Sequence, residues 1–229
     1  MGAKMKTFNP DLIVEVTSVC NRACSGCYAP NIVTNKPATD FFEKNPELFL
    51  RISGLNNAFN QIPVRPYLTT IRGGEPSLHP QLDTLLLISQ RKSYQVMLET
   101  HARWLLPQNV LDHQKLVDAI KSLGIIIKIS FDKMHGLSAD DLQKITNFLE
   151  SNHIDYCIAI TESTIGEFLV TRSFCPWIKD DNIIFQLKAK TTEELVSPGI
   201  GVINAKGEFK RNVTSKFSIL KFETFEAAL

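Results

Sequence analysis

The sequence contains no long hydrophobic run and no excess of charge of either sign. No uninterrupted apolar stretch approaches the roughly 20 residues that a membrane-spanning helix needs. The formal net charge is +1, so no large basic surface for nucleic acid is expected. The opening Met-Gly-Ala-Lys-Met-Lys lacks the apolar core of a signal peptide, and Lys6 stands where a myristoylation signal needs Ser or Thr. We therefore expect a cytoplasmic protein that binds neither membranes nor nucleic acid.

Cysteine is scarce and unevenly distributed. The chain has 5 cysteines among its 229 residues, and three of them fall in one short stretch. An odd, clustered set indicates metal binding in a reducing compartment and argues against a disulfide framework. Hydrophobic residues make up 44% of the chain and charged residues 21%, which is typical of a globular protein with one sizeable core.

The clustered cysteines are Cys20, Cys24 and Cys27, with the spacing Cys-x3-Cys-x2-Cys. Three thiolates this close together suit an iron–sulfur cluster or zinc. A four-iron cluster takes four ligands, and the nearest other cysteine is Cys157. Either another part of the chain supplies the fourth ligand, or one iron stays open to an exogenous molecule, as in a catalytic metal site. The alternative zinc site would draw its fourth ligand from one of three histidines, His79, His101 and His135.

Stretches rich in β-branched residues alternate with stretches of helical periodicity. The predicted strands are Leu12–Thr17, Pro66–Arg72, Gln95–Thr100, Ile125–Phe131, Ile154–Ile160 and Asn182–Leu187. Apolar residues at helical spacing predict helices after Pro37, interrupted at Pro46, and then from Pro80, from Pro107 to Leu123, from Ser138, and from Glu162 to Ser173. This alternation predicts an α/β fold with a parallel sheet and right-handed crossovers.

Two motifs together resemble the radical S-adenosylmethionine (SAM) superfamily. The first is the cysteine triplet, with a hydrophobic strand before it and the aromatic Tyr28 directly after it. The second is Gly73-Gly-Glu-Pro76 at the end of the second strand, which resembles the superfamily's Gly-Gly-Glu-Pro motif. Two glycines let the backbone approach a ligand closely, and the adjacent carboxylate can accept hydrogen bonds from an ammonium group. The resemblance covers roughly residues 12–187.

The resemblance implies a partial (β/α)6 TIM-like barrel whose chemistry lies at the C-terminal ends of the strands. It also implies a [4Fe–4S] cluster held by Cys20, Cys24 and Cys27, with SAM chelating the fourth iron. One electron, from a donor such as flavodoxin or ferredoxin, would cleave SAM to a 5′-deoxyadenosyl radical, which takes a hydrogen atom from the substrate.

The substrate class is left open by the sequence. We expect a small molecule, because only nineteen residues precede Cys20 and no peptide-recognition domain is appended there. The first alternative is modification of a peptide or protein, either in ribosomal peptide maturation or in the activation of a glycyl-radical enzyme. The alternative of another class is an iron–sulfur protein that transfers electrons without radical chemistry.

The region after residue 190 departs from the strand–helix alternation. Gly201–Lys210 predicts a β-hairpin with its turn at 204–207. We expect residues 1–190 to form the barrel domain and residues 191–229 a short C-terminal hairpin extension. In longer members of the superfamily a similar hairpin leads to cysteines for a second cluster, whereas no cysteine follows here. The extension is expected to be either a shortened cap or an edge hairpin that closes the barrel.

Further SAM contacts follow from the resemblance. Gly73, Gly74 and Glu75 are expected to hold the methionine amino group. Ser130 and Asp132, at the end of the fourth strand, are expected to contact the ribose hydroxyls or the carboxylate of SAM. The competing interpretation is that Ser130 satisfies the strand end and Asp132 caps the following turn.

Five further residues carry predictions, and the chain departs from the family pattern at two of them, His101 and Gly26. Many relatives have Thr-Asn-Gly at the end of the third strand, whereas this chain has Thr100 followed by His101. Thr100 is expected at the cofactor, and His101 is a candidate catalytic or substrate-contacting residue, or else a structural hydrogen bonder. Gly26 stands where many relatives have an aromatic residue, which leaves the adenine contact to Gly26 or Tyr28. Ile160, at the end of the fifth strand, is either an apolar wall for the adenine or part of the core.

Overall fold

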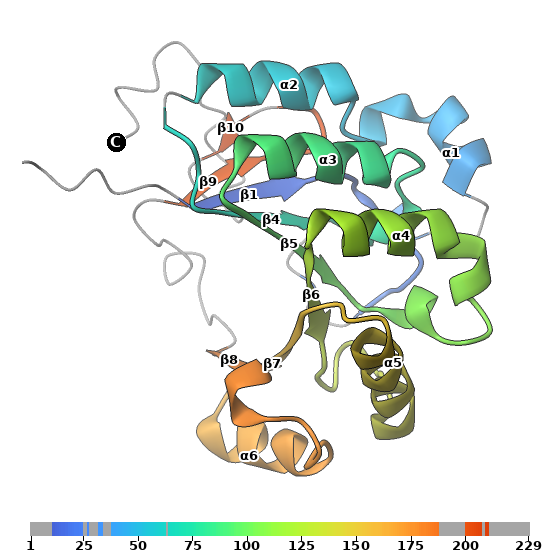
Figure 1. The fold of residues 1–229 in the computed structure, drawn as a ribbon, viewed down its shortest axis with the longest axis vertical. Helices are drawn as coiled ribbons and strands as arrows, with labels where there is room; N and C mark the ends of the chain where they lie inside the picture. The colour runs from blue at the N-terminus through green and yellow to red at the C-terminus, as the bar shows by residue number, and fades with distance from the viewer. Residues whose placement is uncertain are drawn as a thin grey trace, which may run out of the picture.

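The computed structural model describes residues 11–24, 27, 32–33, 38–62, 64–187, 200–207 and 209–210. Its main feature is one eight-stranded sheet with the order β10-β9-β1-β4-β5-β6-β7-β8 (Figure 1). These strands are β1 Asp11–Glu15, β4 Leu68–Arg72, β5 Gln95–Thr100, β6 Ile126–Ser130, β7 Tyr156–Glu162, β8 Ile183–Leu187, β9 Ile200–Ile203 and β10 Phe209–Lys210. Neighbours from β9 to β8 run parallel, and the six predicted strands are confirmed in order as β1, β4, β5, β6, β7 and β8.

The C-terminal hairpin is also present, and it extends the sheet at the free edge of β1. β9 pairs in parallel with β1, and β10 returns antiparallel to β9. Because β8 and β10 stand at opposite ends of the strand order, the described sheet is an open, partial barrel. A separate two-residue pairing joins β2 Val19–Cys20 to β3 Ile32–Val33.

Helices follow the strands in the predicted alternation. The α-helices are α1 Ala38–Lys44, α2 Ile52–Gln61, α3 Leu82–Lys92, α4 Gln114–Leu123, α5 Ala139–Ser151 and α6 Ile165–Ser173. Short 3-10 turns are η1 Pro46–Leu48, η2 Pro76–Leu78, η3 Arg103–Leu105, η4 Val110–His113 and η5 Asp180–Asn182. The interruption expected at Pro46 is confirmed, since α1 ends at Lys44. The helix expected from Pro107 begins only at Gln114, because η4 occupies its first part.

The local signals that bound these helices are those expected from the sequence. The Ser138 hydroxyl caps α5 by accepting from the Asp141 N–H at 3.1 Å. Gly124 ends α4 with a left-handed φ of 62°, which favours glycine over other residues. Figure 1 shows α2 to α6 following one another along one side of the curved sheet.

The two faces of the sheet differ in chemistry. Alternate strand residues pack with the helices in one hydrophobic core, among them Leu12, Val14, Ile71, Val96, Leu98, Ile127, Ile129, Ile158 and Ile160. Successive strand residues point to opposite faces, so the residues between these point away from the helices. We call this opposite side the inner face. It carries Ile13, Glu15, Thr70, Arg72, Met97, Glu99, Lys128, Ser130, Cys157 and Ala159.

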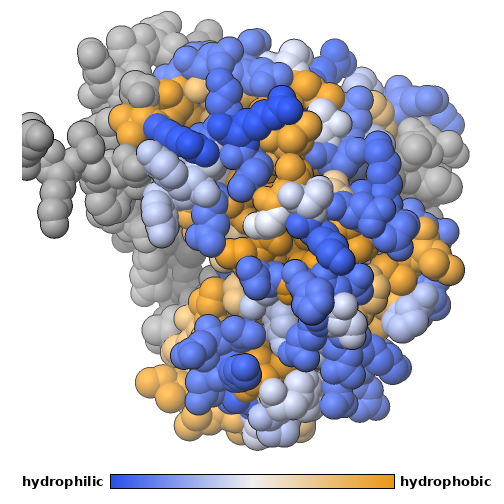
Figure 2. Space-filling view, in the orientation of Figure 1, coloured by the Kyte–Doolittle hydropathy of each residue, from blue (hydrophilic) through white to orange (hydrophobic). Residues whose placement is uncertain are grey.

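The outer surface is mixed except near α6. Several large apolar side chains there are exposed, including Ile165 at 64%, Leu169 at 59% and Phe174 at 57%. Figure 2 shows apolar surface at the lower end of the molecule, where α6 lies in Figure 1. None of the helices in the described part of the chain is both long and apolar enough to cross a membrane.

Candidate functional site

The two sequence motifs meet at the C-terminal edge of the sheet. The cysteine stretch follows β1, and Gly73-Gly-Glu-Pro76 follows β4, the strand that pairs with β1. The C-terminal edge of a parallel barrel is where active sites form, because the loops after neighbouring strands converge there. Residues about fifty positions apart in the sequence are therefore neighbours in space.

Backbone hydrogen bonds join the two motifs directly. The Gly74 N–H donates to the Thr17 carbonyl at 2.7 Å, and the Glu75 N–H donates to the Val19 carbonyl at 2.8 Å. A Cβ at Gly73 would lie 2.4 Å from the Thr17 carbonyl oxygen, which is too close for any other residue type. Gly73 is thus required by the approach of the cysteine loop itself.

The Glu75 carboxylate is almost fully buried, with 1% of the residue exposed, and it accepts three hydrogen bonds from the protein. Its Oε1 accepts from the Ser77 N–H at 3.1 Å and from the Thr100 hydroxyl at 2.7 Å. Its Oε2 accepts from the His101 N–H at 3.1 Å and lies 3.2 Å from His101 Nε2. A carboxylate offers about four acceptor positions, so these hydrogen bonds use three of them, and the His101 ring lies against the fourth. Glu75 fixes the double-glycine turn to the end of β5.

Thr100 is equally saturated. Its hydroxyl donates to Glu75 and accepts from the Ala102 N–H at 2.9 Å and from Trp104 Nε1 at 3.0 Å. A hydroxyl has one donor and two acceptor positions, so Thr100 has none left within this network. The predicted cofactor contact of Thr100 has no support in these hydrogen bonds.

His101 connects three loops and is buried, with 6% of the residue exposed. Its Nδ1 accepts from the Arg103 N–H at 3.2 Å, so the proton of the neutral ring resides on Nε2. Nε2 then faces Asn21 Oδ1 at 2.9 Å, in the cysteine loop, and Glu75 Oε2. Burial lowers the pKa of His101, and Arg22 lowers it further against the opposing effect of Glu75. These contacts match the structural alternative for His101, and its catalytic role remains a prediction.

The three clustered cysteines are free thiols of graded exposure. Cys20 is buried, Cys24 is half-buried and Cys27 is exposed. The Cys27 N–H donates to the Cys24 carbonyl at 3.2 Å, and the Arg22 N–H donates to the Cys20 sulfur at 3.4 Å. Burial raises the pKa of Cys20 to about 11, with further contributions from Glu75, Cys24 and Cys27. Cys24 and Cys27 therefore both lie close enough to Cys20 to affect its pKa.

The thiols suit a cluster in number and chemistry, because three soft ligands leave one iron open. Among the residues that the structure describes, no group of three or more His, Cys, Asp and Glu side chains converges on one metal position. The chain's donor set thus fits a [4Fe–4S] cluster in number and chemistry, although in this structure the three described thiols do not converge on one metal position. Metal binding here must release the thiol protons.

The histidines considered for a zinc site have other partners. His79 packs edge-on against Phe42 and Phe49, and its Nε2 lies 3.0 Å from the Leu50 carbonyl. Burial lowers its pKa to about 4. His135 Nδ1 lies 2.9 Å from both oxygens of Asp132. None of these contacts joins a histidine to a cysteine of the triplet.

Ser130 and Asp132 differ in their availability for a ligand. Asp132 is buried, and its Oδ1 accepts from the N–H groups of Met134 and His135 at 2.9 and 3.0 Å. These bonds are the turn-capping alternative predicted for it. In the described structure the Ser130 hydroxyl makes no hydrogen bond with the protein, and it points to the inner face at the C-terminal end of β6.

The residues expected to contact the adenine are Gly26, Tyr28 and Ile160. Ile160 is fully buried in the hydrophobic core on the helix side of β7, which is the alternative expected for it. Gly26 and Tyr28 lie outside the described residues.

A row of alternating charges on the inner face was missed by the sequence reasoning. The Arg72 guanidinium lies 3.8 Å from Glu15 Oε1, and Lys128 Nζ lies 3.2 Å from Glu99 Oε2. Burial acts to raise the pKa of Glu99, but Lys128 and Arg72 outweigh it and hold that pKa below its usual range. The available signal was one charged residue, in the middle or C-terminal part, in each of four predicted strands that are otherwise uncharged.

Comparison with known proteins identifies the fold. No protein-family model matches the chain, and no curated sequence is similar to it. Among solved structures, anSMEcpe with bound AdoMet matches with a TM-score of 0.55 and 13% identity, covering 80% of this chain and 54% of that one. A second anSMEcpe structure, with AdoMet and the Cp18Cys peptide, matches with a TM-score of 0.52, 14% identity, and coverage of 79% and 54%. SuiB of Streptococcus suis bound to the precursor peptide SuiA matches with a TM-score of 0.44, 13% identity, and coverage of 94% and 62%.

These matches are to longer proteins, of which the chain spans between about half and two thirds. At such low identity the likeness to anSMEcpe establishes the fold alone. That fold is the partial TIM-like barrel of radical SAM enzymes, as predicted from the sequence.

Proposed function

We propose that the chain is a radical SAM enzyme that acts on a small-molecule substrate. The observation that carries this proposal is the direct joining of the cysteine loop to the double-glycine turn at the C-terminal edge of the sheet. An electron carrier has no need of a turn suited to an amino acid beside its cysteines. The solved structures with this fold support the proposal, since anSMEcpe carries bound AdoMet.

In this proposal Cys20, Cys24 and Cys27 hold a [4Fe–4S] cluster. When bound, the cluster and SAM would supply a 5′-deoxyadenosyl radical that abstracts a hydrogen atom from the substrate. The protein's part is to release the thiol protons, to orient the methionine end of SAM, and to keep water away from the reacting atoms.

The Gly73–Glu75 turn offers two kinds of acceptor to the SAM ammonium group. No donor among the described residues contacts the carbonyl oxygens of Gly73 and Gly74, so these oxygens are available. Glu75 adds a negative charge, although three of its four acceptor positions already bind protein donors and the His101 ring lies 3.2 Å from Oε2. We therefore assign the direct hydrogen bonds to the glycine carbonyls, and the anchoring of the turn to Glu75. The Ser130 hydroxyl is available for a further SAM contact.

The decisive experiment is reductive cleavage of SAM by the anaerobically reconstituted protein. With dithionite and SAM we expect 5′-deoxyadenosine, and we expect its loss together with the cluster in Cys24→Ala. Cys175→Ala is the matched control, because Cys175 bonds to the Arg172 carbonyl away from the triplet. A normal cluster spectrum without 5′-deoxyadenosine would favour the electron carrier, and a colourless protein containing zinc would favour the zinc site. We also expect a protein electron donor such as flavodoxin or ferredoxin to support the same cleavage of SAM in place of dithionite.

A peptide substrate is the second candidate. It is favoured by one observation, that an anSMEcpe structure with this fold contains the Cp18Cys peptide. Transfer of deuterium from a labelled substrate into 5′-deoxyadenosine would separate the two substrate classes.

A further inference from the structure

Apart from Asp11 at the start of β1, four neighbouring strands each contribute one charged residue to the inner face, and the signs alternate. The residues are Glu15 on β1, Arg72 on β4, Glu99 on β5 and Lys128 on β6, which we call the charge row. The strand pairing places Glu15 opposite Arg72 and Glu99 opposite Lys128. Their side chains are 19%, 13%, 20% and 10% exposed, so each is at least four-fifths shielded from solvent.

The charge row lies beside the proposed cofactor site. Glu15 and Arg72 are the last residues of their strands, and Arg72 directly precedes Gly73. The unpartnered Ser130 hydroxyl lies on the same face at the end of β6. A ligand in front of the charge row would therefore adjoin the loops that are proposed to hold SAM.

Stability does not account for these charges. Barrel interiors are ordinarily filled by layers of branched apolar side chains. Shielded ion pairs often contribute no more to stability than apolar residues of similar size, because taking charges out of water is costly. The rest of this face includes apolar residues such as Ile13 and Met97, so the fold accepts them there. A layer of charges at the C-terminal edge is better explained by recognition of a ligand.

The arrangement of signs selects the class of ligand. A ligand with a single net charge meets as many like charges as opposite ones, and an apolar ligand would leave the charges desolvated without compensation. A ligand with one charge of each sign can place both opposite their complements, since neighbouring strands lie about 4.8 Å apart. We infer that the charge row binds the ammonium and carboxylate of a zwitterionic, amino-acid-like substrate.

In this arrangement the two central residues bind the ligand. The guanidinium of Arg72 suits a carboxylate, which it can bind through two parallel hydrogen bonds, and Glu99 accepts from the ammonium group. Glu15 and Lys128 flank them, holding Arg72 and Glu99 by the two ion pairs. The inference rests on the proposed function, because that function places SAM beside the charge row. It favours a free amino acid as the substrate, since a residue inside a peptide has neither an α-ammonium nor an α-carboxylate group.

The test is binding of the standard free α-amino acids and their N-acetyl amides, measured by equilibrium dialysis. The reconstituted protein is kept with saturating SAM and without reductant, so that SAM occupies its own site. We expect at least one free amino acid to bind about tenfold more tightly than its N-acetyl amide. In Glu99→Gln this preference should fall to about unity.

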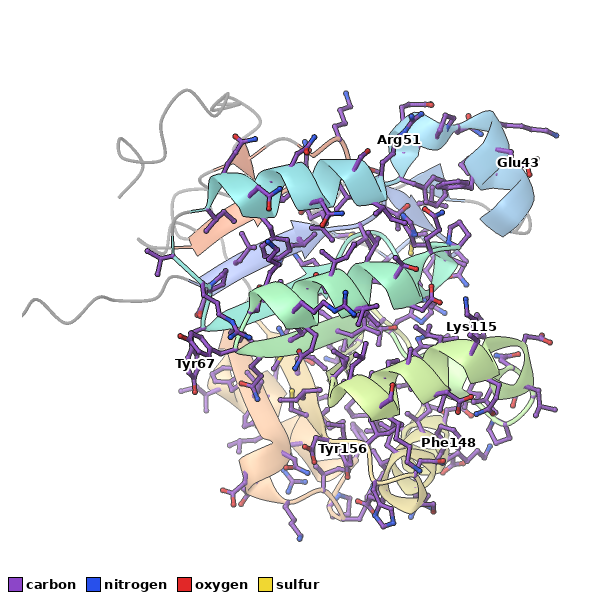
Figure 3. The ribbon with its side chains drawn as sticks, turned by 45° about the horizontal axis from the view of Figure 1, so that its top comes forward. Glu43, Arg51, Tyr67, Lys115, Phe148 and Tyr156 are labelled. Carbon is purple, nitrogen blue, oxygen red and sulfur yellow. The ribbon has the colours of Figure 1, made fainter. Side chains whose placement is uncertain are left out.

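Two further variants keep the result interpretable. The double variant Glu99→Gln/Lys128→Gln removes both partners and leaves no unpaired buried charge, and it should also lose the preference. Asp83→Asn is the control, because it breaks a 2.6 Å pair on the helix side of the sheet, between Asp83 and the exposed Lys115, which projects from α4 in Figure 3. It should retain the preference.

The inference is overturned if no amino acid is preferred over its amide, or if the preference survives the double variant. The same preparation is assayed for 5′-deoxyadenosine after dithionite is added. If amino-acid binding depends on Glu99 but no 5′-deoxyadenosine forms, the proposed function is wrong and the recognition of zwitterions is supported. If 5′-deoxyadenosine forms but no amino acid is preferred over its amide, the proposed function is supported and the recognition of zwitterions is wrong.

Discussion

Replacing Glu75 by glutamine tests whether the carboxylate of the double-glycine motif is chiefly an anchor for the turn. The change keeps the size of the side chain but converts one oxygen into an NH2 group. Two donors bond to Oε1, from Ser77 and Thr100, and the backbone N–H of His101 bonds to Oε2. The amide NH2 group therefore faces two donors in one orientation and one donor, beside the His101 ring, in the other. The Thr100 hydroxyl cannot turn away, because it already accepts from Ala102 and Trp104.

The expected loss follows from one or two buried hydrogen bonds to a charged group. At about 1.5–3 kcal/mol each, Glu75→Gln should lower the free energy of unfolding by about 1.5–6 kcal/mol. For a chain of this size that corresponds to a fall in Tm of about 3–24 °C. The measurement is urea unfolding of the metal-free protein, followed by circular dichroism.

The matched control is Glu150→Gln. Glu150 is exposed and accepts from the Tyr156 hydroxyl at 2.7 Å, so its loss should cost less than about 1 kcal/mol. If Glu75→Gln unfolds within about 1 kcal/mol of the unmodified protein, the anchoring role derived from its four contacts is refuted. A contact with the SAM ammonium would then be the main role of Glu75.

Two further predictions test the surroundings of the motif. Gly73→Ala should lower the free energy of unfolding by about 1–3 kcal/mol and reduce the iron retained on reconstitution, because the new Cβ would clash with the Thr17 carbonyl. The control is Gly54→Ala in α2, where a Cβ meets Leu50 at an ordinary 3.5 Å. Its free energy of unfolding should be unchanged or higher. The folded-state pKa of His79, about 4, lies below the ordinary 6.5, so the unfolded chain binds the extra proton and stability falls as pH drops from about 6.5 toward 4. Between pH 7 and pH 5 this histidine should lower the free energy of unfolding by about 2 kcal/mol. Urea unfolding of His79→Gln at both pH values should show a fall in the free energy of unfolding that is smaller by that amount.

The strands could be predicted from the sequence because parallel strands are recognisable locally. Buried strands of a parallel sheet are rich in β-branched residues, as in Ile125–Phe131, and each is bounded by turn or helix signals. The C-terminal hairpin was equally visible from its turn. Its attachment to β1 was not, because the pairing of residues about 190 positions apart leaves no local pattern.

The site was predictable in position but not in contacts. Motif spacing and strand order bring the cysteine loop and the double-glycine turn to one edge, as expected. Which donors surround Glu75, and that Asn21 and His101 meet at 2.9 Å, depends on loop conformations that side-chain periodicity does not encode. The charge row could not be predicted for a related reason. Each charged residue is isolated within its own strand, and the row becomes visible only when the register of the four strands is known.

The contacts of Glu75 and His101 change how variants of this site should be interpreted. The cysteine loop is tied to the double-glycine turn by backbone hydrogen bonds at Thr17 and Val19, and again through Asn21. A substitution in the turn therefore moves the residues proposed to hold the cluster as well as those proposed to hold SAM. Loss of iron in a Glu75 or Gly73 variant would be a consequence of this connection, since neither residue is among the proposed metal ligands. Cofactor affinity and cluster retention should accordingly fall together when the turn is altered, and separately only when a cysteine or an inner-face residue such as Ser130 is replaced.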